Sequence, residues 1–240
     1  MKYDTILVLD FGGQYCHLIG RRIREYGVYS ELVPHDIKPE EIKLLSEKFN
    51  VKGLVFSGGP ASVYESNAPR PDPSILGLDL PVLGLCYGHQ LIAKMAGGKV
   101  EPAKQREYGI AYIAIDRPVG VLKGLSNREK VWMSHGDTVL SIPAEYEVLA
   151  HTEICPVAAF RHNEKPIYGL QWHPEVVHTE KGTQMLHNFI FEVCKCEPDW
   201  KMEDVVEKAV KEIKADVGDG RAIIALSGGI DSSVATALAA

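Results

Sequence analysis

Short apolar segments alternate with amphipathic ones along the first part of the chain. Residues 5–9 and 28–33 have the length and composition of buried strands, while residues 18–23 and 39–49 carry apolar side chains at helical spacing. Because strands separated by helices pair in parallel, this alternation predicts an α/β fold, a mostly parallel open sheet with helices on both faces. Residues 112–168 have more strand-like segments and fewer helices, so we expect some antiparallel pairing there. Sites in such folds lie at the carboxyl ends of strands.

One cysteine falls at such a position. Residues 81–85 predict a buried strand, residues 91–96 predict a helix, and Cys86 lies in the turn between them. Free N–H groups and the positive dipole end of a helix favour a thiolate over a thiol. Gly84 and Gly88 leave little bulk around the sulfur. Cys86 is therefore a candidate nucleophile, and a buried core cysteine is the alternative.

His173 and Glu175 are candidate partners for that thiol. Pro174 disfavours helical geometry at His173, and side chains two apart in an extended segment point the same way. His173 could take a proton from sulfur and donate one to a leaving amine, while Glu175 orients the imidazole. Thiol, imidazole and carboxylate are the groups that acyl transfer by cysteine requires. A structural role is the alternative for His173.

A glycine turn supplies a third element. Residues 53–56 form an apolar segment that runs into Ser57-Gly58-Gly59-Pro60. Backbone N–H groups of this turn, with the N–H of Tyr87 after the cysteine, could stabilise a developing oxyanion. An ordinary loop is the alternative, since Gly-Gly-Pro is common in turns.

Together these residues resemble the class I glutamine amidotransferases, whose nucleophile turn reads Gly-x-Cys-x-Gly-x-Gln and whose partner motif reads His-Pro-Glu. Within that class the chain is similar to the GMP synthase family over nearly its whole length, in the stretches at residues 10–15, 106–109, 134–137 and 173–179. It departs from many relatives at Gly13, where they carry Ser, and at His89, where they carry Met.

The resemblance implies roles for the candidate residues. Cys86 would attack the side-chain amide of glutamine and form a γ-glutamyl thioester, with His173 and Glu175 completing the triad. Gly59 and Tyr87 would supply the oxyanion N–H groups. Gln90 would help bind the substrate glutamine, although a glutamine in the first turn of a helix needs no special role.

A second motif lies near the end of the sequence. Residues 221–226 predict a strand, followed by a glycine and serine loop and a helix from about Asp231, an arrangement that suits phosphate binding. No Gly-Lys-Ser/Thr follows, so the loop is not a Walker A motif. It resembles the pyrophosphate loop of the ATP pyrophosphatases, which implies ATP binding by Ser227, Gly228, Gly229, Asp231, Ser232 and Ser233.

These modules together imply the function of the GMP synthase family. Ammonia from glutamine would aminate ATP-activated xanthosine monophosphate to give GMP. ATP and its Mg²⁺ would act in the synthase part, and the full-length form would allow a homodimer. We expect a glutamine amidotransferase domain at 1–196 and, at 197–240, a linker with the first fragment of the pyrophosphatase domain. The chain would thus be the N-terminal piece of a longer protein and at most a glutaminase.

Three alternatives stay open for the function: a glutaminase domain that serves another synthase, a cysteine amidohydrolase of a different substrate, and an assembly protein without turnover. If the GMP synthase interpretation holds, His135, Asp137 and residues 106–109 are candidates for the face that contacts the synthase part, with loop stabilisation as the alternative.

Composition excludes several other classes. A net charge of −6 argues against general nucleic-acid binding, and no apolar run reaches membrane-spanning length. The start of the sequence carries no signal peptide, so we expect a cytoplasmic protein. Five cysteines, an odd number, favour free thiols. We expect no protein-bound metal, because Cys194 and Cys196 have no second pair at zinc-ligand spacing.

Overall fold

The computed structural model describes residues 2–240, except for the side chains of residues 104, 105, 204 and 208. The chain divides into two compact units, Met1–Asp199 and Trp200–Ala240, each described by itself below. The expected domain boundary, between residues 196 and 197, stays a prediction.

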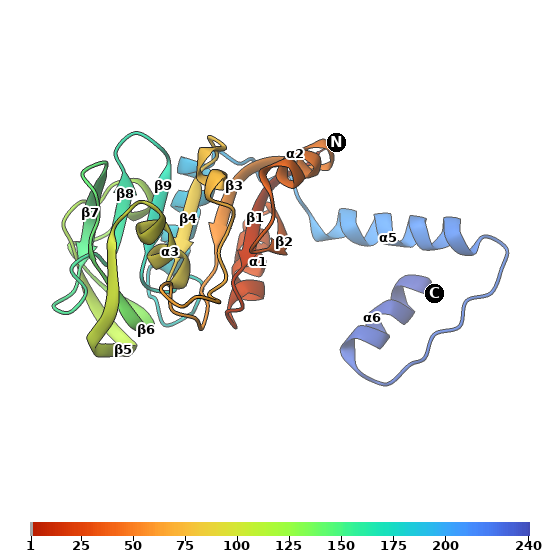
Figure 1. Ribbon diagram of the computed structural model, residues 1–240. Helices are drawn as coiled ribbons and strands as arrows, with labels where there is room; N and C mark the ends of the chain where they lie inside the picture. Colours follow the sequence, from red (N-terminus) through yellow and green to blue (C-terminus); the bar gives the residue numbers. More distant parts are fainter. Residues whose placement is uncertain (1) are drawn as a thin grey trace. The chain divides into compact units, whose positions relative to one another are not determined.

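The described part of the first unit is built on one nine-stranded sheet with the order β2-β1-β3-β4-β9-β8-β7-β5-β6 (Figure 1). Its strands are β1 (Asp4–Asp10), β2 (Tyr29–Pro34), β3 (Asn50–Phe56), β4 (Val82–Leu85), β5 (Lys99–Ile115), β6 (Arg128–Ser141), β7 (Tyr146–His151), β8 (Ala159–His162) and β9 (Ile167–Leu170). Neighbours from β2 to β9 pair in parallel, and the remaining neighbours pair antiparallel. This confirms the predicted open α/β sheet and the antiparallel pairing expected in its middle segment.

The helices lie where amphipathic patterns predicted them. They are α1 (Cys16–Glu25), α2 (Pro39–Lys48), α3 (Tyr87–Met95), α4 (Gly182–His187), α5 (Met202–Val217) and α6 (Ile230–Ala239), with the shorter helices η1 (Pro73–Gly77) and η2 (Gly120–Leu122) and the π-helix η3 (Asn188–Val193). The single helix expected over residues 183–193 is thus two: α4 continues directly into the wider turns of η3.

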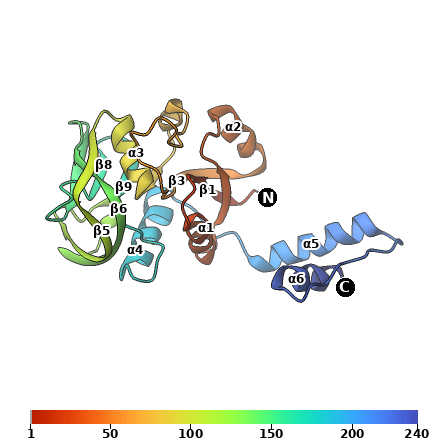
Figure 2. The same ribbon diagram turned by 60° about the horizontal axis from the view of Figure 1, so that its bottom comes forward.

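Helices cover both faces of the sheet (Figure 2). On one face, Ile6 and Val8 of β1 join a buried cluster with residues of α1, α4 and η3. On the other, Leu7 and Leu9 join a cluster with residues of α2 and α3. Because successive strand residues point to opposite faces, an unbroken apolar run is what a strand covered on both sides requires.

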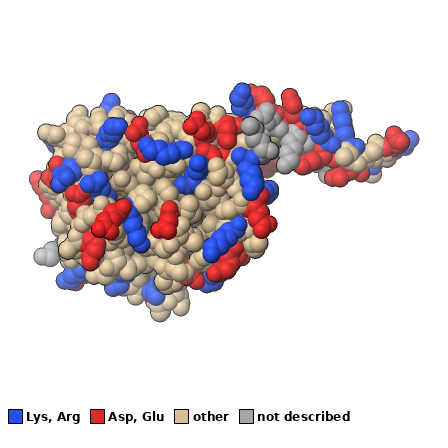
Figure 3. Space-filling view, turned by 90° about the horizontal axis from the view of Figure 1, so that it is seen from above, with Lys and Arg blue, Asp and Glu red and all other residues tan. Residues whose placement is uncertain are grey.

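The charged residues of the first unit are mixed in sign. In Figure 3, Lys and Arg side chains alternate with Asp and Glu over the face seen from above. Among the described residues, no helix is both long and apolar enough to span a membrane.

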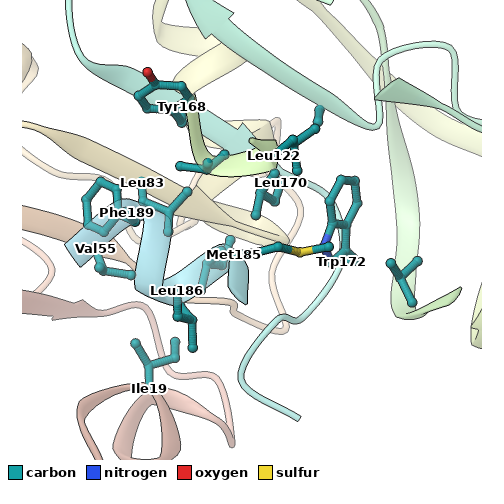
Figure 4. Packing of buried hydrophobic residues seen from close by; sticks show 14 of the residues in the cluster. Ile19, Val55, Leu83, Leu122, Tyr168, Leu170, Trp172, Met185, Leu186 and Phe189 are labelled. Atoms are coloured by element: carbon teal, nitrogen blue, oxygen red, sulfur yellow. The ribbon is translucent and has the colours of Figure 1, made fainter. Parts of the chain in front are cut away.

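The first of the two buried clusters surrounds the strands that lead into the candidate site (Figure 4). Met185 and Leu186 of α4 pack there near Leu170 and Trp172, and the Trp172 indole N–H donates to the Met185 sulfur at 3.2 Å. Trp172 has no exposed surface. Burial of such large side chains contributes about 1.5–3 kcal/mol each, and here it anchors the end of β9 just before His173.

The second unit consists of α5 and α6 joined by an extended segment. The strand predicted at residues 221–226 is wrong, since that segment has no strand pairing and its side chains are exposed. A strand needs a neighbouring strand to satisfy its N–H and C=O groups, and none is described in this unit. The predicted helices at about 202–214 and from about Asp231 are confirmed by α5 and α6.

Close packing of α3 against β4 yields a testable prediction. A methyl group added at Gly84 would lie 2.6 Å from the backbone carbonyl of Gly88 and 2.7 Å from the Ile92 side chain. We expect Gly84→Ala to lower the free energy of unfolding by about 1–3 kcal/mol, because helix and strand must separate to admit it. Urea unfolding followed by tryptophan fluorescence measures this.

Gly77→Ala is the matched control, since a methyl group there meets no atom within 4 Å. It should change the free energy of unfolding by less than about 0.5 kcal/mol. Equal stability of the two variants would contradict the tight contact between α3 and β4.

Candidate active site

The turn at Cys86 joins β4 to α3 with an unusual backbone. Cys86 has φ +51° and ψ −104°, a left-handed conformation that costs a non-glycine residue about 1–3 kcal/mol. Two hydrogen bonds hold it: the Cys86 N–H donates to Leu170 O at 2.8 Å, and the Gln90 N–H donates to Cys86 O at 3.1 Å. The thiol lies 3.4 Å from Ser134 O. This is the geometry of a nucleophile elbow.

His173 and Glu175 form a buried pair beside this thiol. His173 Nδ1 lies 2.7 Å from Glu175 Oε1, and the Cys86 sulfur is near enough to the imidazole to influence its pKa. The prediction that the two side chains point the same way is confirmed by their contact. The segment that carries them is not a strand, however, since β9 ends at Leu170. The backbone is held as well, because the His173 N–H donates to Trp132 O at 3.1 Å and the Thr179 hydroxyl donates to His173 O at 2.6 Å.

The surroundings favour a charged imidazole. Burial opposes the charge, yet the Glu175 carboxylate and the Cys86 sulfur outweigh it, so the pKa of His173 lies well above its ordinary value. The second carboxylate oxygen of Glu175, Oε2, has no hydrogen-bond partner among the described residues. Its charge therefore acts on His173 with little competition from other donors.

The glycine turn after β3 packs against both partners. A methyl group on Gly58 would lie 3.0 Å from His173 Cε1 and 3.7 Å from Cys86 Cβ, so the thiol and imidazole converge on this glycine. Ser57 shapes the turn: its hydroxyl accepts from the Phe11 N–H and donates to Gly58 O, each at 3.0 Å, and its carbonyl accepts from the Gly88 N–H at 3.2 Å. The turn is thus tied to the ends of β1 and α3.

A pocket of about 810 Å³ opens at these groups. It is bounded by the loop after β1, the turn after β3, the start of α3 and the β5–β6 hairpin. Its lining includes Gln14, Tyr15, Gly58, Gly59, Ser62, Tyr64, Cys86, Tyr87, Gln90, Arg106, Tyr108, Ser134, His135, Gly136, Asp137 and His173. The structure therefore gathers Cys86, His173, Gly59, Tyr87 and Gln90, with Glu175 behind His173.

Gln90 forms part of the pocket wall through buried contacts. Its side-chain Nε2 donates to Asp137 O at 3.0 Å and to Gln171 Oε1 at 3.1 Å. The amide nitrogen is therefore used within the protein, and a role in binding a ligand stays a prediction.

His135 and Asp137 lie in the pocket wall and have partners of their own. His135 is buried with Nδ1 2.8 Å from Asp137 O and Nε2 3.0 Å from Glu107 Oε2. Asp137 Oδ1 accepts from the Tyr64 hydroxyl at 2.7 Å. Both residues thus stabilise the hairpin and line the pocket, and contact with a synthase part stays a prediction for them.

His89 occupies the core rather than the pocket. It is fully buried, its ring centroid lies 4.8 Å from that of Phe160, and burial and the nearby His135 lower its pKa to about 3. A neutral imidazole here fills apolar space, as a methionine of similar size would.

The Ser227–Ser233 loop belongs to the second unit. Gly228 has φ +83°, the Ser227 and Ser232 hydroxyls lie 3.0 Å apart, and the Ser232 and Ser233 hydroxyls donate to Gly229 O at 3.0 and 2.9 Å. The loop thus places hydroxyls and free N–H groups at the start of α6, which suits an anion. Across the described residues, no group of three or more His, Cys, Asp or Glu side chains has the arrangement of a metal site.

Comparison with known proteins shows the family. Residues 7–193 match the family described as glutamine amidotransferase class-I. The chain belongs to the class I glutamine amidotransferases. Over 238 residues it is 53% identical to a glutamine-hydrolysing GMP synthase of Caldanaerobacter subterraneus subsp. tengcongensis, a match that covers 99% of this chain and 46% of that protein. It is 52% identical over 235 residues to that of Bacillus subtilis, covering 98% and 45%. The chain thus spans about half the length of these relatives.

Solved structures share the amidotransferase fold. A protein of Thermoplasma acidophilum, described as one subunit of a GMP synthase, is 31% identical, with a TM-score of 0.72 over 87% of this chain and 99% of that one. A glutamine amidotransferase from Thermotoga maritima is 20% identical, with a TM-score of 0.59 over 100% of both chains, and shows likeness of fold alone.

Three residues at this amidotransferase site have roles that the sequence did not indicate, although they lie in motifs noted above. Tyr15 packs edge-on against His173, with ring centroids 5.1 Å apart, Ser57 holds the glycine turn, and Ser134 meets the Cys86 thiol with its carbonyl. No local pattern indicates these roles, because Tyr15, Ser57 and Ser134 contact residues that are distant in the chain.

The raised pKa of His173 gives a testable prediction. Replacing Glu175 by Gln removes the charge that stabilises the imidazolium, so the titration midpoint of His173 should fall by about 1–3 units. Wild-type His173 should stay charged to higher pH than the variant. NMR titration of the ring C–H resonances measures both midpoints.

Asp116→Asn is the control, since it removes the carboxylate that lies 2.8 Å from the exposed His151. It should leave the His173 midpoint where it is. An unchanged midpoint in Glu175→Gln would show that this carboxylate does not govern the imidazole.

Proposed function

We propose that this chain is the glutamine-hydrolysing part of a GMP synthase and releases ammonia from glutamine. One observation carries the proposal: a strained cysteine turn meets a buried His–Glu pair at the wall of one pocket. High identity to GMP synthases along almost the whole chain supports the choice of enzyme.

The proposed reaction begins with the Cys86–His173 pair. The imidazole holds the proton that the thiol has given up, which agrees with its raised pKa, and the sulfur attacks the side-chain amide carbon of glutamine. The negative charge moves to the amide oxygen, where the N–H groups of Gly59 and Tyr87 stabilise it. The C–N bond then breaks as His173 gives its proton to the nitrogen, leaving ammonia and a γ-glutamyl thioester.

Water completes the cycle. His173 accepts a proton from water as the oxygen attacks the thioester, and the C–S bond breaks to release glutamate and regenerate the thiol. Glu175 stabilises the imidazolium in both halves of the reaction, and its contact with His173 Nδ1 holds the ring in place. Ser57 positions the glycine turn through the hydrogen bonds described above.

The pocket suits an amino acid substrate. Arg106 and Asp137 line it and provide one positive and one negative group, which match the carboxylate and ammonium of free glutamine. Gln90 shapes the wall near the thiol and would contact the side-chain amide. These groups distinguish glutamine from a simple amide.

The remaining roles belong to the whole enzyme. The Ser227, Gly228, Gly229, Asp231, Ser232 and Ser233 loop would hold the phosphates of ATP together with Mg²⁺. ATP would activate xanthosine monophosphate, and ammonia would replace the activated oxygen to give GMP. The proposal also includes a homodimer of the whole enzyme and a cytoplasmic location.

A glutaminase domain serving a different synthase is the second candidate. The glycine and serine loop favours a GMP synthase over it, because that loop resembles those of enzymes that split ATP into AMP and pyrophosphate.

Glutamate release from glutamine tests the proposed function. The 240-residue chain should hydrolyse glutamine, and Cys86→Ala should lower the rate by at least about 10³-fold, as loss of a nucleophile does. Cys196→Ala, which removes another buried thiol, is the control and should keep the rate within about twofold.

Thiol alkylation separates glutamine from other amides. Glutamine should protect Cys86 from iodoacetamide, while asparagine at the same concentration should not. Equal protection by both would favour a cysteine amidohydrolase of other substrates, and no hydrolysis of glutamine by the folded chain would disprove the proposal.

A further inference from the structure

A strip of exposed apolar side chains lies on the outer face of the β5–β6 hairpin. Tyr108, Ile110 and Tyr112 alternate along β5 and are 65%, 55% and 54% exposed, while their odd-numbered neighbours turn inward. Ile110 pairs across the strands with Trp132 of β6. We name Tyr108, Ile110, Tyr112, Trp132, Val177 and His178 the hairpin surface.

The hairpin surface is continuous beyond β6. The Trp132 ring lies against His178, with centroids 4.6 Å apart, and the residue before His178, Val177, is 76% exposed. At its other edge, Arg128 lies over the Tyr112 ring at 4.4 Å. Monomeric proteins rarely expose large contiguous apolar patches, and tyrosine, tryptophan and arginine are enriched at protein interfaces. The composition is therefore that of a docking surface.

This surface borders the mouth of the active-site pocket. Tyr108 belongs to the hairpin surface and also lines the pocket, together with Arg106 and Gly136. A partner bound on the surface would therefore lie beside the opening through which a small product leaves.

The strand beneath the surface also holds the reacting groups. Within β6, Ser134 O lies 3.4 Å from the Cys86 thiol, and Trp132 O accepts the His173 N–H at 3.1 Å. A shift of β6 caused by contact on its outer face would change both positions. Docking there can thus alter the rate of glutamine hydrolysis.

We propose that the hairpin surface docks the synthase half of the enzyme, the half that the curated relatives carry and this chain does not span. This inference rests on the proposed function. The chain covers 46% of a relative's length, so a partner of comparable size exists in those proteins. Ammonia that reaches bulk water is protonated and loses its nucleophilicity, which favours a consumer at the pocket mouth. A second copy of this chain would cover the mouth without consuming ammonia.

A chimera tests the inference directly. This chain is joined to the remaining half of the Caldanaerobacter relative, and hydroxyl-radical footprinting compares side-chain reactivity in the chimera, with xanthosine monophosphate and ATP, against the chain alone. Tyr108 and Tyr112 should become less reactive in the chimera, whereas Leu44, which is 63% exposed on α2, should not change.

A charge placed on the surface provides the second readout. Ile110→Asp in the chimera should lower glutamine-dependent GMP formation, relative to ammonia-dependent formation, by about tenfold, because an interface centre tolerates a buried charge poorly. The same variant of the chain alone should release glutamate at a rate within about twofold of wild type, since Ile110 does not line the pocket. Leu44→Asp is the matched control and should leave the ratio unchanged.

The outcomes separate this inference from the proposed function. Unchanged reactivity of Tyr108 and Tyr112, or an unchanged ratio in Ile110→Asp, would overturn the docking surface. A dimer of the chain alone that Ile110→Asp dissociates would overturn it too, because the occupant would then be a second copy. Footprint protection without any glutamine hydrolysis would support the surface and disprove the glutaminase.

Discussion

The backbone turn at Cys86 is the constraint on which the site depends. A cysteine at φ +51° is stable only because β4, β9 and α3 hold it from several sides. Gly84 and Gly88 let the helix approach the strand closely enough to close that turn. The sheet core therefore holds the candidate site together, since loosening α3 would relax the turn and move the thiol away from His173.

The pocket joins two structurally different halves of one sheet. The parallel half supplies Cys86 and the glycine turn at the ends of β4 and β3, as open α/β sheets do. The antiparallel hairpin supplies Ser134, His135 and Asp137 as another part of the wall. Because β6 contacts both Cys86 and His173, the hairpin also links these two residues to the outer surface of the first unit.

Charge at the site is arranged to keep the imidazole protonated. Burial alone would make His173 neutral, so the raised pKa depends on Glu175 and the nearby sulfur. The nearby His89 shows the opposite case, because it is buried without a carboxylate and its pKa is lowered to about 3. Partner and burial together decide which histidine carries a charge at neutral pH.

Local patterns in the amino-acid sequence were sufficient for the parallel strands, the helices between them, the cysteine turn and the His-Pro-Glu pairing, because each arises from residues close in the chain. They were insufficient for Ser57, Tyr15 and Ser134, whose contacts join distant segments. The strand expected at residues 221–226 failed for the same reason, since a strand requires a neighbour that local sequence does not provide. Long-range packing alone placed the hairpin beside the thiol and left Tyr108, Ile110 and Tyr112 facing outward.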